Sequence, residues 1–369
     1  MIRVLHFYKS FFPNSTGGVE RVILEIIQSN KIFGVESAVL TTNNLGRKYS
    51  YTFEDIKVYS VPAFFKISST PLSIQAIFEF KKLVKEFDIV HFHFPYPMAD
   101  ILNLFNNKKS IVTYHSDIVK QKNMMKIYAP IMRRYLRNVD KIVATSENYL
   151  KSSQILSALK KNIEVIPIGI STNQISQPKK ERVDYWQRRF GKKFFLFLGV
   201  FRYYKGLNFL VEAASSLPYP IVIAGSGEME VSLKKITKDR NIKNIFFPGF
   251  IAEEDKSALI KASYAFLFPS HLRSEAFGVS LLEAACLSKP MISCEIGTGT
   301  SYVNLDKETG IVIKPGSPEE LKKAMSSLWN DPDLVGKYGN SARSRFINNF
   351  TSKIMGKRYL YLYQKLTNG

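Results

Sequence analysis

Residues 194–206 read FFLFLGVFRYYKG, and this stretch decides the fold. Its first five residues are all apolar, which is typical of a parallel strand buried on both faces. The strand is predicted to end at Gly199, and residues 207–214 are predicted to form a helix. Ligands of open α/β sheets bind at the carboxyl ends of strands. Arg202 and Lys205 are therefore placed to bind a diphosphate, although a solvated charged turn is the simpler alternative.

Strands and helices alternate on both sides of this stretch. Before it, strands are predicted at Ile2–Phe7, Ser37–Thr41, Ile89–Phe94, Ile111–Tyr114, Lys141–Ala144 and Glu164–Pro167. After it, they are predicted at Pro220–Ala224, Ile245–Phe247, Ala265–Phe268, Met291–Ser293 and Ile311–Ile313. Helices such as Val19–Ser29 and Leu72–Glu86 lie between them, so the fold class is α/β with parallel sheets.

The strand–helix pattern restarts once, which predicts two domains in a chain of 369 residues. We place an N-terminal Rossmann-like domain at residues 1–172 and a C-terminal one at residues 173–350. Residues 351–369 carry Tyr359 and Tyr363 at helical spacing, and we expect this last helix to cross back to the first domain.

The chain is strongly basic, with 52 Lys and Arg against 31 Asp and Glu and a formal net charge of +21. Such an excess favours nucleic acid, an acidic membrane face or phosphorylated ligands, without choosing among them. No segment has the composition of a secretory signal or a membrane span, so we expect a cytoplasmic protein.

A second candidate ligand segment follows the strand predicted at Ala265–Phe268. Glu275 and Glu283 are separated by seven residues, with a helix expected to begin near Gly278. Carboxylates accept hydrogen bonds from sugar or ribose hydroxyls, and the amides around residues 277–280 suit a phosphate or sugar oxygen. A capped amphipathic helix explains the same residues without a ligand.

Two weaker signals lie in the first domain. Gly17 and Gly18 join the first strand to the first helix, which lets the backbone approach a ligand or simply makes a tight turn. His115 follows an apolar strand, where it can bond a sugar hydroxyl or phosphate, although a lone histidine is more often structural.

Two patterns resemble metal sites, but we predict no metal. Asp331-Pro332-Asp333 lies between two predicted helices, which favours a helix start for Asp333. His91 and His93 share one face of a strand, but no nearby Cys or acid completes a tetrahedral set. We interpret them as strand-end residues, with His93 lining an acceptor cleft.

Together these motifs resemble the retaining family-4 glycosyltransferases, whose fold, GT-B, has two Rossmann-like domains with parallel sheets facing across a cleft. The Gly-Gly loop, the strand-end histidine, Arg202-x-x-Lys205-Gly206 and Glu275-x7-Glu283 occur in the family's order over most of the chain. The resemblance implies a nucleotide-sugar donor as substrate and no metal or other cofactor.

The resemblance also assigns roles to the matching residues. Arg202 and Lys205 would neutralise the donor diphosphate, Glu275 and His115 would contact the donor sugar, and Glu283 would hold the ribose. The remaining donor-binding residues would be Gly17, Gly18, Gly225, Phe277, Gly278 and Val279.

A narrower resemblance, to bacterial mannosyltransferases of O-antigen and exopolysaccharide assembly, rests on residues 273–278 and 293–304. It implies GDP-mannose as donor and a lipid-linked oligosaccharide as acceptor, with other GDP- or UDP-sugars as alternatives. Many relatives carry an acidic residue a few positions after the glycines in residues 293–304, whereas this chain has Val303 and Asn304 there.

A basic, helix-like segment, residues 120–141, is the candidate for binding an anionic membrane surface. Its apolar stripe is Met124, Tyr128, Ile131, Tyr135 and Val139, flanked by Lys122, Lys126, Arg133, Arg134 and Arg137, and Pro62–Ile67 adds aromatics in a predicted loop. The stripe is more simply a core-facing side, but the charges can still dock on lipid, making the enzyme peripheral on the inner face of the cell membrane.

Two rival functions follow from charge and fold. A nucleic-acid-binding protein would explain the charge, but the chain has no recognisable module for it. A sugar-nucleotide epimerase would share the fold and the phosphate-binding residues.

Overall fold

The computed structural model describes residues 1–67, 70–118, 122–159, 163–173, 175 and 177–368, without the side chains of residues 67 and 122–125. The chain divides into two compact units. Unit 1 is Met1–Gly169 together with Ser352–Gly369, and unit 2 is Ile170–Thr351. The first division thus lies three residues before the predicted boundary at 172/173.

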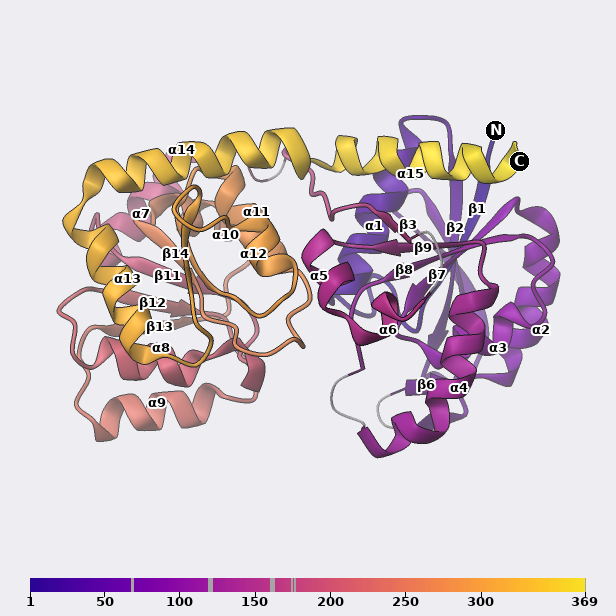
Figure 1. Ribbon diagram of the computed structural model, residues 1–369, viewed down its shortest axis with the longest axis horizontal. Coiled ribbons are helices and arrows are strands. Elements are labelled where there is room, and N and C mark those ends of the chain that lie inside the picture. Colours follow the sequence, from indigo (N-terminus) through magenta and orange to yellow (C-terminus); the bar gives the residue numbers. More distant parts are fainter. Residues whose placement is uncertain (68–69, 119–121, 160–162, 174, 176, 369) are drawn as a thin grey trace. The chain divides into compact units, whose positions relative to one another are not determined.

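Unit 1 is built on an eight-stranded sheet with the order β10-β9-β8-β7-β1-β2-β4-β3 (Figure 1). Its strands are β1 (Arg3–Phe7), β2 (Glu36–Asn43), β3 (Tyr49–Phe53), β4 (Ile56–Pro62), β7 (Ile89–Phe94), β8 (Lys109–Tyr114), β9 (Lys141–Ala144) and β10 (Ile163–Val165). β3 pairs with β4 antiparallel, and the other neighbouring strands pair parallel.

Helices connect these strands as the alternation predicted. They are α1 (Gly18–Lys31), α2 (Ile74–Leu83), α3 (Pro97–Asn103), α4 (Lys122–Asn138), α5 (Glu147–Ser152) and α6 (Gln154–Ser157), with a 3-10 turn η1 (Val84–Glu86) after α2. α1 buries Val22, Ile23, Ile26 and Ile27, the apolar residues at helical spacing.

The segment expected to be a loop at Pro62–Ile67 is partly strand, so that prediction was wrong. β5 (Phe65–Ile67) pairs antiparallel with β6 (Thr70–Leu72). The alternating side chains of such a short ribbon give little sequence signal for a strand.

The last helix, α15 (Ser352–Thr367), belongs to unit 1 and packs beside α1 (Figure 1). A Cβ added at Gly356 would lie 2.8 Å from the backbone oxygen of Ser29, so glycine is what lets the helices approach so closely. Tyr363 and Tyr359 reach the sheet, where the Tyr363 hydroxyl bonds His91 Nδ1 at 2.8 Å. Residues that follow unit 2 in the chain therefore complete the core of unit 1.

Unit 2 is built on a six-stranded parallel sheet with the order β13-β12-β11-β14-β15-β16. Its strands are β11 (Phe195–Leu198), β12 (Ile221–Ala224), β13 (Ile245–Gly249), β14 (Ala265–Phe268), β15 (Met291–Cys294) and β16 (Gly310–Ile313). The strand order reverses between β11 and β14, and ligands of Rossmann-like sheets bind at such a switch point.

Helices flank this sheet on both sides (Figure 1). They are α7 (Lys180–Phe190), α8 (Leu207–Ala214), α9 (Glu230–Asp239), α10 (Glu253–Ala262), α11 (Val279–Cys286), α12 (Gly299–Val303), α13 (Pro318–Asn330) and α14 (Pro332–Asn349), with a 3-10 turn η2 (Tyr203–Lys205). Phe195 and Phe197 share a core cluster with residues of α8, α9 and α13.

Candidate functional site

The loops after β11 and β14 are pressed together at the switch point of unit 2. Gly206, in the loop after β11, has a φ of 70°, in the left-handed region. A Cβ there would lie 2.0 Å from the backbone oxygen of Pro269, in the loop after β14. Glycine is therefore required at position 206, and it brings the neighbouring Lys205 next to the Glu275 segment.

Lys205 and Glu275 form an ion pair at this point. Lys205 Nζ lies 2.5 Å from Glu275 Oε2, and the two side chains are only 13% and 12% exposed. Ser270 Oγ also donates to Glu275 Oε2, at 3.3 Å, and Lys205 Nζ lies 4.7 Å from the centre of the Phe268 ring. A cation and a carboxylate are thus fixed side by side with little water around them, which strengthens their interaction.

Arg202 is less constrained than Lys205. Its guanidinium lies 3.6 Å from Glu228 Oε2, and both side chains are about half exposed. An exposed pair of this kind is weak and easily exchanged for another anion.

Backbone amides face the same region at the start of α11. Gly278 is the N-cap residue of α11, with a φ of 87°, and among the described residues no side chain caps the helix. The first N–H groups of a helix have no partner inside it, so they are available to bind an oxygen atom. Phe277 is buried against Gly299, where a Cβ would lie 2.5 Å from the Phe277 ring, so this start of α11 is held in place.

Beside these loops lies a pocket of about 250 Å³ at the carboxyl ends of β11, β12 and β13. It is lined by Leu198, Gly199, Val200, Gly225, Ser226, Phe250, Ile251, Lys256, Ser280 and Glu283. Gly225 has a φ of 126°, and a Cβ there would lie 2.0 Å from the Gly199 oxygen, which makes a close backbone wall. The pocket therefore combines a carboxylate, a lysine and an apolar rim.

Sequence reasoning gave no role in this pocket to Phe250, Ile251 or Lys256. Phe250 is 77% exposed although it is aromatic, and it directly follows the strand end at Gly249. Lys256 comes from α10, which carries no motif. The available signal was an apolar pair, Phe250-Ile251, separated by two residues from the predicted strand Ile245–Phe247.

Gly17 and Gly18, in unit 1, lie at the start of α1. Gly17 is the N-cap residue, and a Cβ there would lie 2.4 Å from Glu20 Oε2. Ser10 Oγ and Ser15 Oγ donate to Glu20 Oε1 at 2.6 and 2.7 Å. The carboxylate of Glu20 thus lies beside this helix start and is held there by two serine hydroxyls.

His115, also in unit 1, follows β8 and ends a hydrogen-bonded row of three buried histidines. His115 Nε2 lies 3.0 Å from His93 Nδ1, and His93 Nε2 lies 3.1 Å from His6 Nδ1. His91 bonds Thr113 and Tyr363 instead. His93 is fully buried, so the prediction that it lines a cleft was wrong.

Burial governs the protonation of these histidines. It lowers the pKa of His6 and of His115 from 6.5 to about 3, and it lowers the pKa of His91 and His93 well below 6.5. All four are therefore neutral at physiological pH.

The sequence pattern that resembled a metal motif at Asp331 has a structural role. Asp331 is the N-cap residue of α14, and its side chain accepts a hydrogen bond from the Leu334 amide at 2.9 Å. Asp333 lies in the first turn of α14, as predicted.

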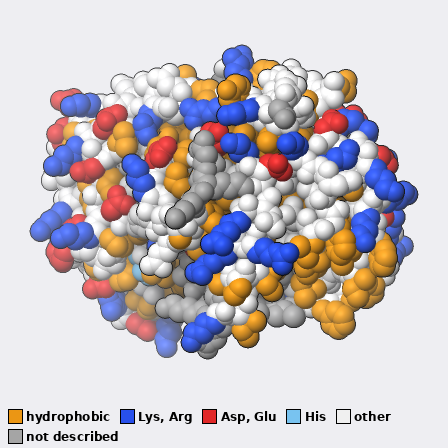
Figure 2. Space-filling view, turned by 45° about the vertical axis from the view of Figure 1, so that its right-hand side comes forward, with side chains coloured by type: hydrophobic (Ala, Val, Ile, Leu, Met, Phe, Trp, Pro, Cys, Tyr) orange, Lys and Arg blue, Asp and Glu red, His pale blue; other side chains and the backbone are white. Residues whose placement is uncertain are grey.

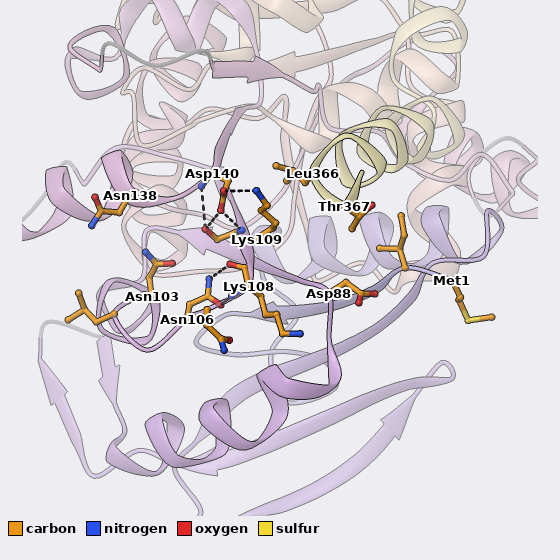
Figure 3. Close-up of a pocket in the computed structure, with 14 residues that line it drawn as sticks. Met1, Asp88, Asn103, Asn106, Lys108, Lys109, Asn138, Asp140, Leu366 and Thr367 are labelled. Carbon is orange, nitrogen blue, oxygen red and sulfur yellow. Dashed lines mark hydrogen bonds and ion pairs between the residues drawn. The ribbon is translucent and has the colours of Figure 1, made fainter. Parts of the chain in front are cut away.

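A larger pocket, about 960 Å³, lies in unit 1 where the strands begin (Figure 3). Its polar groups bond one another: Asp140 accepts from Ser110, and the Asn106 side chain donates to the Lys108 oxygen at 2.8 Å. Ligands of parallel α/β sheets bind at the opposite, carboxyl end. We therefore do not place the functional site in this pocket.

Comparison with known proteins gives the family. Residues 16–174 match Glycosyltransferase Family 4, and residues 179–345 match Glycosyl transferases group 1. The chain is 42% identical to O-antigen chain mannosyltransferase C of Escherichia coli, over 99% of both sequences. The protein belongs to the family 4 glycosyltransferases. This glycosyltransferase is also 41% identical to D-rhamnosyltransferase WbpZ of Pseudomonas aeruginosa, over 95% of its own length and 93% of the relative's.

Solved structures show that the glycosyltransferase has the GT-B fold. Sucrose-phosphate synthase from Thermosynechococcus elongatus superimposes with a TM-score of 0.82 at 17% identity, over 100% of both chains. Anabaena HepE in complex with UDP gives 0.81 at 14% identity, over 99% of this chain and 100% of HepE. The expected fold class, with two Rossmann-like units on parallel sheets, is confirmed.

The family match favours the enzyme over the nucleic-acid-binding protein that the charge had suggested.

Within the described residues, every helix is too short or too polar to span a bilayer.

Proposed function

We propose that this glycosyltransferase moves a hexose, with mannose from GDP-mannose as the favoured donor, to a lipid-linked oligosaccharide in O-antigen or exopolysaccharide assembly. The Lys205–Glu275 pair at the switch point of unit 2 carries the proposal, because it sets a phosphate-binding cation beside a sugar-binding carboxylate. The likeness over 99% of an O-antigen mannosyltransferase supports the sugar and the pathway. The likeness to a D-rhamnosyltransferase makes a 6-deoxyhexose the main alternative sugar.

In this proposal the donor diphosphate lies against Arg202, Lys205 and the first amides of α11. Lys205 has three N–H donors, so it can hold a phosphate oxygen while it keeps its bond to Glu275. Arg202 exchanges its exposed contact with Glu228 for phosphate oxygens. These fixed positive groups stabilise the departing nucleoside diphosphate without a metal ion.

The nucleoside occupies the pocket of about 250 Å³. Glu283 accepts hydrogen bonds from the ribose hydroxyls, and the exposed ring of Phe250 offers a face for the base to stack on. Gly225 lets the nucleotide approach the backbone, and Glu275 holds hydroxyls of the sugar.

The transfer itself proceeds with retention of anomeric configuration. The bond between the sugar's anomeric carbon and the diphosphate oxygen breaks, and the acceptor oxygen bonds the same face of that carbon. The acceptor proton passes to the departing phosphate, and His115, in unit 1, contacts the donor sugar.

A thermal-shift panel tests the donor, because a ligand that binds the folded state raises its apparent stability. GDP, UDP and ADP would each be added with magnesium and with EDTA. We expect GDP alone to raise the midpoint, and equally in both conditions. A UDP-selective shift would replace GDP-mannose by a UDP-sugar, and a shift that needs magnesium would contradict the metal-free site.

We further propose that unit 1 docks on an anionic membrane surface. Large exposed apolar side chains lie on the helices α2 and α4, which both pack against α3, and on β5. They include Phe65, Phe78, Ile127 and Ile131, all more than half exposed. Figure 2 shows apolar side chains gathered on this part of the molecule with Lys and Arg around them.

The structure also corrects the predicted apolar stripe of the basic helix. Tyr135 and Val139 are buried as expected, but Ile131 is exposed beside Arg133 and Arg134. Lys120 lies outside the described residues, as do the side chains of Lys122 and Met124. An exposed isoleucine among cations suits a lipid surface better than a core.

Sedimentation with vesicles tests the docking. At low salt, vesicles with anionic lipid should pellet the protein and neutral vesicles should not, because each basic residue near the surface contributes about 1 kcal/mol. The double variant Arg133→Gln, Arg134→Gln should lose much of this binding. The control Lys238→Gln, Lys243→Gln makes the same charge change in unit 2 and should keep it. Equal loss in both variants would leave net charge as the cause and exclude docking through α4.

A further inference from the structure

Three histidines from three different strands or strand ends form a hydrogen-bonded row. His6 lies in β1, His93 in β7, and His115 directly after β8. The bonds run from His6 Nδ1 to His93 Nε2 and from His93 Nδ1 to His115 Nε2, at 3.1 and 3.0 Å. Nδ1 of His115 is the remaining nitrogen at the end of the row, and no described residue bonds it.

Proton counting leaves only two arrangements for this row. Each ring is neutral, because burial holds the pKa of all three imidazoles far below 7. A neutral imidazole carries one N–H, so the donors must all point in the same direction along the row. Either His6 donates to His93 and His93 to His115, or both bonds run in reverse.

His6 Nε2 distinguishes the two arrangements. It is buried and has no hydrogen-bond partner among the described residues. If the bonds ran from His115 toward His6, this nitrogen would carry a buried, unpaired N–H, which is rare in folded proteins. If the bonds run from His6 toward His115, Nε2 of His6 carries no hydrogen and leaves only a lone pair without a partner.

We propose that the row runs from His6 to His115 and fixes His115 as the tautomer that presents Nδ1–H at the end of β8. His6 and His93 are then positioning residues, which act through His115. The inference rests on the proposed function for its use, which is to supply a permanent, uncharged hydrogen-bond donor for an oxygen of the donor sugar. Nδ1 of His115 then cannot act as a general base, because that nitrogen already holds a proton.

A metal ion shared by the buried histidines is the competing explanation. Ligand atoms of His6, His91 and His93 lie within 4.8 Å of one another. However, both nitrogens of His91 already bond hydroxyl groups, those of Tyr363 and Thr113. The His91 and His93 rings are also stacked, with their centres 4.4 Å apart and an interplanar angle of 21°. Imidazole lone pairs lie in the ring plane, so nearly parallel stacked rings do not aim them at one point.

Nitrogen NMR of the ¹⁵N-histidine-labelled protein reads the tautomers directly, because protonated and bare imidazole nitrogens differ in chemical shift. At pH 7.5 we expect His115 and His6 each to carry the proton on Nδ1, with signals assigned by their loss in His115→Gln and His6→Gln. A proton on Nε2 of His115 would overturn the proposal. So would stoichiometric zinc in the purified protein.

Kinetics of three variants test the positioning role. His93→Leu removes the donor to His115 and should lower kcat on the order of 10–100-fold, the size typical of losing a partner that orients a functional histidine. His93→Asn places an amide N–H near the former Nδ1 and should recover most of kcat. The matched control His91→Leu is equally buried but outside the row, so it should lose stability and keep kcat.

Equal losses of kcat in His93→Leu and His91→Leu would overturn the positioning role, because both histidines would then act only through packing. If the wild-type protein transferred no sugar from any nucleotide donor, the proposed function would fail. The NMR measurement would still decide the tautomer of His115.

Discussion

Glu275 is bound to two neighbours through one oxygen atom. Lys205 and Ser270 both donate to Oε2, so among the described residues Oε1 has no such donor and is available to a ligand. The pair with Lys205 is nearly buried, which means that removing the charge of Glu275 leaves an ammonium group without its counter-ion.

We expect Glu275→Gln to lower sugar transfer by at least about 10²-fold, because an uncharged amide binds sugar hydroxyls more weakly and no longer fixes Lys205. The fold should persist, since the shape of the side chain is unchanged. Initial transfer rates and the thermal midpoint measure the two effects. Glu228→Gln, at the exposed contact with Arg202, serves as the control. Near-normal turnover in Glu275→Gln would remove this residue from the site.

Asp100 shows that a single buried carboxyl group can oppose folding. It lies in α3 and is 4% exposed, and neither of its carboxylate oxygens has a hydrogen-bond partner among the described residues. Burial raises its pKa from 3.8 to about 7. A raised pKa means that the folded state holds the proton more tightly than the unfolded chain. The free energy of unfolding therefore decreases as pH rises from 3.8 through 7, because the folded state must give up this proton.

Asp100→Asn should accordingly be more stable than the wild type at pH 8 and equal to it at pH 3.5. Each unit of pKa shift corresponds to roughly 1.4 kcal/mol. Urea unfolding at the two pH values measures the difference. A gain of the same size at both pH values would contradict the explanation by protonation.

Among the strands, the fully apolar ones that are buried on both faces were predictable, and the strands of the two hairpins were not. Fully apolar runs such as β11 and β14 predict strands from sequence alone, because a strand buried on both faces carries mostly apolar residues. The hairpin of β3 and β4 was missed because its turn is Glu54-Asp55, both with positive φ, where an Asn-Gly pair is the usual signal.

The sequence motifs point to residues that lie within single loops, and they miss residues that distant elements bring together. Lys205 and Glu275 lie in the loops after β11 and β14, which are neighbours in the sheet, so the strand order brings the two loops together. His6 lies inside an apolar strand and meets His93 only through the pairing of β1 with β7. Lys256 reaches its pocket from an ordinary helix, which no local pattern reveals.

Two helical glycines give a matched test of the packing between α15 and α1. Gly356→Ala places a methyl group 2.8 Å from Ser29 and should destabilise unit 1, although alanine favours helices by about 1 kcal/mol. Gly336→Ala, in α14, meets nothing within 4 Å and should stabilise the protein by up to about that amount. Thermal unfolding of the two variants decides. A stabilised Gly356→Ala would show that the helices can separate at no cost.

The molecule as a whole should be acid-labile. Burial lowers the pKa of His6 and His115 to about 3, and lowers it for His91 and His93 as well, so the unfolded chain binds more protons between pH 6.5 and pH 3. Stability is then complete above pH 6.5 and is lost as pH falls. Asp100 makes the free energy of unfolding change with pH in the opposite direction, but it is one group and the histidines are four.

We therefore expect a clearly lower urea midpoint at pH 5 than at pH 7.5, with up to roughly 1.4 kcal/mol lost per pH unit for each neutral histidine. The His6→Phe variant, which removes one of these groups, should show a smaller difference between the two pH values. Equal midpoints at pH 5 and pH 7.5 would mean that the histidines have the same pKa in the folded and the unfolded state.

The return of α15 to unit 1 also sets an order for folding during synthesis. On the ribosome, residues 1–169 emerge first but lack the helix that covers α1 and the hydroxyl of Tyr363 that bonds His91. Unit 2 is continuous in the chain, so all of its residues leave the ribosome before Ser352–Thr367 do. The half of the polypeptide that is translated first is therefore the last to be completed, and it must wait for the final helix with part of its core uncovered.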